Sequence, residues 1–144
     1  MEIELSSSSG DTKIIINLLD WQYPKVRSGS DSEWLFADLS FRSPMFSAQI
    51  KNNPFMQFSE LSNLAKGINN ILSRNRGKLS FSTLEPYFKI SLELMRNGSI
   101  LILGTISDLD RKSGHLDFTF SSDQSCLNLF IKSLEIELKR LKRK

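Results

Sequence analysis

The sequence holds few residues that could carry out acid–base, nucleophilic or metal chemistry. It has one histidine, His115, and one cysteine, Cys126. A catalytic histidine needs a nucleophile and an orienting acid around it. Strand alternation places Asp117 on the same face as His115, and a lone His–Asp pair is a weak signal. We therefore interpret His115 as an ordinary residue at the start of a strand. The alternative is a metal site made by His115, Asp117 and one further carboxylate.

Cys126 falls in the first turn of a predicted helix, a position that can activate a thiol. We interpret it as a small packing residue, and a single cysteine excludes an internal disulfide. The acidic turn around Asp108 lacks the twelve-residue ligand pattern of a calcium loop. Gly104 lacks the partner glycines of a phosphate-binding loop. The sequence thus predicts no catalytic residue, no metal site and no cofactor.

Length and composition favour a single domain over residues 1–144. Of these residues 40% are hydrophobic and 24% charged, which is ordinary for a globular chain and excludes intrinsic disorder. The first residues lack the basic and apolar regions of a signal peptide. The longest apolar run, 100–103, is far shorter than the roughly 20 residues of a membrane-spanning helix. We therefore expect a soluble cytoplasmic protein with no membrane contact.

The net charge of +3 is concentrated at the C-terminus. Five basic residues lie in the basic tail, residues 139–144, and the other 138 residues hold 14 basic and 16 acidic side chains. Cations at a helix C-terminus interact well with the helix dipole. We interpret the tail as a solvated helix end, so its deletion should cost only about 1–2 kcal/mol, through the loss of Leu141. The alternative is contact with nucleic acid or an anionic membrane.

Hydrophobic periodicity divides the chain into strands and two helices. Helical spacing occurs at 59–74 and 123–142, with Ser59 and Asp123 as expected N-caps. Residues 20–32 have the composition of a loop. Alternation of period two predicts strands at 2–5, 13–19, 34–42, 46–51, 79–83, 88–94, 100–106 and 116–120. The β4-α-β4-α order predicts an α+β domain with a mainly antiparallel sheet of about eight strands and two main helices.

One segment, residues 20–38, combines aromatic residues with carboxylates. Aromatics provide buried anchors at protein interfaces, and carboxylates steer a basic partner toward them. The alternative is that Trp34 and Phe36 pack under a helix that covers this face of the sheet. The candidate binding residues are Tyr23, Asp31, Glu33, Trp34, Phe36 and Asp38.

Several short motifs also carry a resemblance to a known family. They are spread along residues 14–141. From the N-terminal side they are residues 20–24, which include Tyr23-Pro24; residues 31–35, which include Trp34-Leu35; Leu84-Glu85-Pro86; Gly104; the predicted strand 116–120; and Asp123-Gln124-Ser125 followed by Leu127. In this order they resemble the WapI-type bacterial immunity proteins. None of the motifs is catalytic, and Pro86 also predicts a bend with Glu85 exposed.

The resemblance implies a non-enzymatic cytoplasmic protein that binds and neutralises a toxin. Its partner would be the toxic C-terminal domain of a wall-associated contact-inhibition toxin, and the toxin of the namesake pair attacks tRNA. The contact residues do not come from the resemblance; they are predicted from charge and aromatic content. Two alternatives stay open: a nucleic-acid-binding module that uses the basic C-terminal helix, and a binding domain with another partner.

Overall fold

The computed structural model describes residues 2–112 and 114–142, apart from the side chain of Ser30. It contains eight strands and two main helices in the predicted order, which confirms the α+β class. The bounds are β1 Ile3–Ser6, β2 Lys13–Trp21, the short 3-10 helix η1 Ser30–Glu33, β3 Trp34–Arg42, β4 Ser47–Gln57, α1 Phe58–Arg74, β5 Gly77–Ser82, β6 Phe88–Leu94, β7 Ile100–Asp108, β8 Gly114–Ser122 and α2 Gln124–Leu141.

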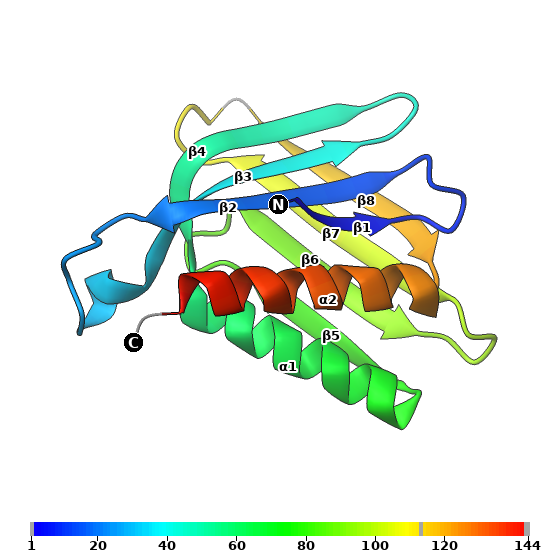
Figure 1. Cartoon of the computed structure of the whole chain (residues 1–144). Helices are drawn as coiled ribbons and strands as arrows, with labels where there is room; N and C mark the ends of the chain where they lie inside the picture. The colour runs from blue at the N-terminus through cyan, green and yellow to red at the C-terminus, as the bar shows by residue number, and fades with distance from the viewer. Residues whose placement is uncertain (1, 113, 143–144) are drawn as a thin grey trace.

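The strands form two antiparallel sheets of four, not one sheet of eight. Sheet A has the order β1-β2-β3-β4 and sheet B the order β5-β6-β7-β8. The helix α1 separates β4 from β5 in the chain, so no hairpin joins the two halves into one sheet. Figure 1 shows the strands of sheet A crossing in front of those of sheet B, with α1 and α2 side by side below sheet A.

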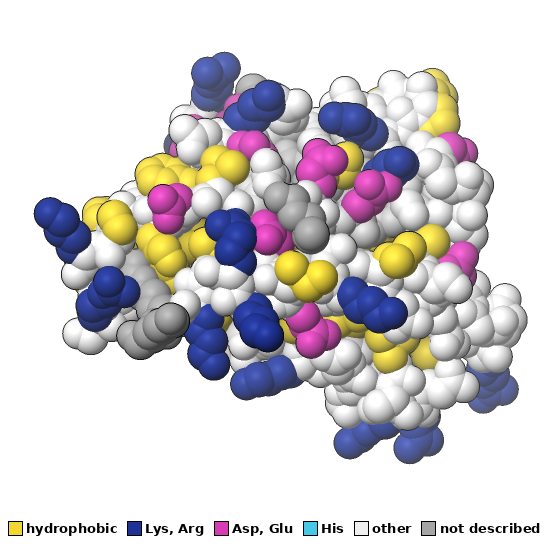
Figure 2. Space-filling view, in the orientation of Figure 1, with side chains coloured by type: hydrophobic (Ala, Val, Ile, Leu, Met, Phe, Trp, Pro, Cys, Tyr) yellow, Lys and Arg dark blue, Asp and Glu magenta, His cyan; other side chains and the backbone are white. Residues whose placement is uncertain are grey.

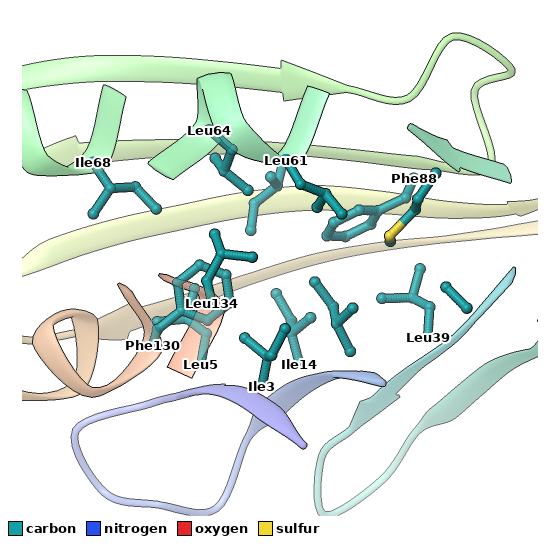
Figure 3. Packing of buried hydrophobic residues seen from close by; sticks show 14 of the residues in the cluster. Ile3, Leu5, Ile14, Leu39, Leu61, Leu64, Ile68, Phe88, Phe130 and Leu134 are labelled. Atoms are coloured by element: carbon teal, nitrogen blue, oxygen red, sulfur yellow. The ribbon is translucent and has the colours of Figure 1, made fainter. Parts of the chain in front are cut away.

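The core lies between the two sheets and the two helices. Alternate residues of β3, such as Leu35 and Leu39, are fully buried on its inner face. They belong to one cluster with Leu61 of α1, Phe88 of β6 and Leu134 of α2, as Figure 3 shows. Because both sheets and both main helices contribute to this one cluster, it joins the two halves of the chain.

The two helix starts test the predicted N-caps. Asp123 is the N-cap of α2, and its carboxylate accepts a hydrogen bond from the backbone N–H of Cys126 at 2.8 Å, which lowers the pKa of Asp123. The prediction of Ser59 for α1 is wrong by two residues, since Gln57 is the N-cap. The Glu60 carboxylate accepts from the Gln57 backbone N–H at 2.9 Å, so the residue three positions into the helix caps it.

Candidate functional site

The strands β2 and β3 position the acidic–aromatic segment, residues 20–38. β2 continues to Trp21, so the first two of these residues lie in a strand and not in the predicted loop. Gln22 N–H donates to the Trp34 carbonyl at 2.9 Å, which keeps the strands paired at the base of the loop. Residues 22–29 remain a loop, and the short helix η1 then leads into β3.

Three of the predicted binding residues lie on one face of β3. Leu35 and Ala37 are buried inward, so Trp34, Phe36 and Asp38 point to the outer face of sheet A, where each is partly exposed. Figure 1 shows both helices below sheet A, on the side of β1, and neither lies in front of β3. The alternative that Trp34 and Phe36 lie under a covering helix is therefore wrong.

The neighbouring strand adds a carboxylate to this face, and the segment between β2 and β3 holds a further ring and a further carboxylate. Asp20 is the cross-strand neighbour of Phe36, so the two side chains lie on the same face of sheet A. Tyr23 is 42% exposed on the loop, and Asp31 is exposed in η1, three residues before Trp34. Figure 2 shows hydrophobic side chains interspersed with carboxylates at the left end of sheet A. Asp20 was not among the predicted binding residues, because the sequence analysis placed it in a loop and ended the strand before it.

Two of the predicted carboxylates have roles within the fold. Glu33 accepts a hydrogen bond from the Ser59 hydroxyl at 3.0 Å, which joins η1 to the start of α1. Asp38 accepts from the backbone N–H of Asn52 at 2.7 Å, where Asn52 has a positive φ of 47° in an irregular part of β4. The binding role of both carboxylates therefore stays a prediction, and Asp31 is the more accessible of the three.

The sequence profile of the immunity protein WapI-like family matches residues 4–142, nearly the whole chain. The chain belongs to this family. No curated protein matches the sequence. As a WapI-like immunity protein, the chain has a toxin as its partner. Within the described residues no three His, Cys, Asp or Glu side chains gather as a metal site would require.

The basic tail of this WapI-like protein is more than a solvated helix end. Arg140 donates to both carboxylate oxygens of Glu137, at 3.0 and 3.2 Å, and to the Leu18 carbonyl at 3.0 Å. The Glu137 side chain is only 3% exposed, and the hydrogen bonds from Arg140 lower its pKa. These contacts lead us to expect a larger cost than the sequence suggested for losing Arg140, while the small cost predicted for deleting the whole tail stays a prediction. Arg143 and Lys144 lie outside the described residues.

The other singled-out motifs take ordinary structural positions. His115 and Asp117 do share a face, with 3.7 Å between Nε2 and Oδ2, and both are largely exposed. Cys126 is partly buried and accepts a weak hydrogen bond from Ser6. Glu85 is exposed in the bend after β5, as predicted. None of the described helices is both long and apolar enough to cross a membrane.

Proposed function

We propose that the chain neutralises the toxic C-terminal domain of a wall-associated contact-inhibition toxin by binding it in the cytoplasm. The match of the immunity family to residues 4–142 carries this proposal. Inhibition of this kind needs no bond-making chemistry, because a tight interface of about 1,600 Å² in total can keep substrate from the toxin. The chain therefore acts as a binding protein and not as an enzyme.

The acidic–aromatic segment is the proposed contact surface. A toxin that holds tRNA needs cationic side chains at its phosphate-binding surface. Asp20 and Asp31 offer carboxylates to such a surface, and Trp34, Phe36 and Tyr23 offer partly exposed rings as anchors. Carboxylates of this kind speed the encounter, and buried rings slow dissociation.

Replacing an anchor should weaken the complex through faster dissociation. Phe36→Ala removes a ring from the outer face of sheet A, and a buried interface anchor of this size is worth about 2 kcal/mol or more. Surface plasmon resonance against the C-terminal domain of the cognate toxin should show at least about a 30-fold faster dissociation. Phe46→Ala is the matched control, since Phe46 is 57% exposed in the β3–β4 turn. Equal dissociation rates for the two variants would contradict the proposed anchor.

Reversing an exposed charge should act on association instead. Asp31→Lys should slow association several-fold at low ionic strength and make binding less dependent on salt, because charges steer encounter. Thermal unfolding should change by less than about 0.5 kcal/mol, since Asp31 is exposed. Glu2→Lys, an equal reversal at another exposed position, controls for net charge. If both reversals change the association rate alike, the effect belongs to overall charge and not to this surface.

A further inference from the structure

The two sheets have four outer edges, and three of them are shielded. α2 packs against β1, the outer strand of sheet A. β5, the other outer strand of sheet B, is only six residues long, contains Lys78 and contacts α1. β4 has two register shifts against β3 and contains Pro54, which interrupts its edge. Bulges, prolines and covering helices are the means by which proteins prevent an edge strand from pairing with another chain.

The fourth edge strand, β8, lacks these protections over most of its length. It pairs with β7 over nine residues with no register shift. No other described strand pairs with it, and its sequence contains neither proline nor lysine. Among the described residues, one backbone hydrogen bond covers its end, where Ser8 N–H donates to the Ser121 carbonyl at 3.1 Å. A long, regular and open edge is a site where an extended chain can add.

The bond to Ser8 also fixes which backbone groups point outward. In a strand the N–H and C=O of one residue point to the same side, and successive residues alternate. Because the Ser121 carbonyl points away from β7, so do the N–H and C=O groups of His115, Asp117 and Thr119. No group of the described residues forms a hydrogen bond with these three N–H or three C=O groups. They make a row of alternating donors and acceptors, which an extended backbone matches.

A cleft of about 550 Å³ lies at the beginning of this edge. One wall comes from β4, including Ala48 and Ile50, and the other from β7 and the start of β8, including Leu116. These three apolar side chains are partly buried and pack against the core. A strand added to β8 turns every second side chain toward the same side as Leu116. The cleft therefore provides space and apolar contact for one or two of those side chains.

We infer that β8 binds an extended segment of the toxin, which extends sheet B by one strand along residues 115–119. The segment has apolar residues at alternate positions, which enter the cleft beside Ala48, Ile50 and Leu116. Its other side chains lie beside Asp117, whose side chain is 72% exposed on the outer face of sheet B. A basic residue of the toxin segment, placed opposite Asp117, pairs with its carboxylate. This inference rests on the proposed function, since it assigns a second contact to the same partner.

Hydrogen–deuterium exchange on the complex tests the backbone contact directly. The probe is the C-terminal domain of the cognate toxin, in a catalytically inactive form. Outward amides of an edge strand exchange quickly when they face water. The N–H groups of Asp117 and Thr119 should exchange at least about tenfold more slowly in the complex, while that of Glu2 should be unchanged. Unchanged exchange at Asp117 and Thr119 in a formed complex overturns the inference and leaves the proposed function standing.

A pair of variants at one residue separates the backbone from the side chain. Thr119→Pro removes an outward N–H and places a ring on the edge, yet it leaves the bonds to β7 intact because those come from the even-numbered residues. It should weaken toxin binding at least about tenfold, whereas Thr119→Val, which keeps the N–H, should bind like the unmodified chain. If circular dichroism shows that Thr119→Pro does not fold, the variant Asp117→Pro and the exchange measurement test the inference in its place.

The remaining outcomes are also decisive. Equal binding by Thr119→Pro and Thr119→Val overturns the inference alone. Failure of the unmodified chain to bind the toxin domain overturns both the inference and the proposed function. If sedimentation shows a dimer of the unmodified chain that Thr119→Pro abolishes while toxin binding is unaffected, the edge serves a second copy of this chain, and the toxin segment is excluded.

Discussion

Gly104→Ala should cost the folded chain about 3 kcal/mol, near the upper end of what overpacking a core usually costs. A Cβ at this position would lie 2.4 Å from Cζ of Phe118 and 2.7 Å from the backbone carbonyl oxygen of Lys89. The Phe118 ring also stacks on Phe41 of sheet A, with 4.5 Å between the ring centroids. Neither the ring nor the strand backbone can move away without disturbing the contact between the two sheets. Urea unfolding should show the loss as a lower midpoint with an unchanged slope.

Gly67→Ala is the matched control for that substitution. A Cβ there would lie 2.9 Å from the end of the Leu79 side chain, which is flexible and can shift. Position 67 lies inside α1, where alanine is favoured over glycine by about 1 kcal/mol. The two effects oppose each other, so the stability of Gly67→Ala should stay within about 1 kcal/mol of the unmodified chain. Equal losses for the two variants would contradict the close packing described at Gly104.

Arg140→Met should destabilise the fold by about 2–3 kcal/mol at pH 7. Removing one partner of a buried ion pair costs about 3–5 kcal/mol, and the expected loss is smaller here because the Arg140 side chain is 48% exposed. The variant removes two hydrogen bonds to the buried Glu137 carboxylate and the bond from Arg140 to the Leu18 carbonyl, which joins α2 to β2. Lys139→Met removes the same charge from an exposed neighbour and should change stability by less than about 0.5 kcal/mol.

The cost of Arg140→Met should also depend on pH. The pKa of Glu137 is lowered in the folded chain, so the pair stabilises the fold above the ordinary value of about 4.5 and loses this contribution as pH falls through the lowered pKa. In the variant, the loss of the hydrogen bonds from Arg140 moves the pKa of the same carboxyl upward, so protonation relieves part of the loss. The stability difference measured by urea unfolding should therefore shrink between pH 7 and about pH 4. A difference that stays constant over this range would show that Arg140 acts through packing alone.

Periodicity predicted most of this fold because the buried residues of each element are close together in sequence. The helical spacing of α1 can be recognised from Leu61, Leu64 and Ile68 alone. The alternation of β3 can likewise be recognised from Leu35 and Leu39 within that strand. The division into two sheets depends on which strands lie side by side across α1, and periodicity within an element contains no information about that. The extension of β2 through Asp20 and Trp21 was missed for a similar reason, since these residues gain their strand structure from pairing with β3.

The candidate site was predictable only in part. Alternation correctly placed Trp34, Phe36 and Asp38 on one face of β3. It did not show that Glu33 and Asp38 bind Ser59 and Asn52, which lie 26 and 14 residues away in the chain. The pairing of Arg140 with Glu137 has helical spacing in the sequence, but only the packed structure shows that the carboxylate is buried. The open edge of β8 is a property of the whole sheet arrangement and has no signal in the sequence of that strand.

Growth protection tests the central claim most directly. The cognate toxin domain is induced in cells that express either this chain or Gly104→Ala, with soluble levels of each protein measured. We predict that cells with the unmodified chain keep growing and that the toxin domain purifies with it as a complex, while Gly104→Ala protects less because less of it is folded. Growth arrest at full soluble levels of the unmodified chain, with no complex recovered, would contradict the account.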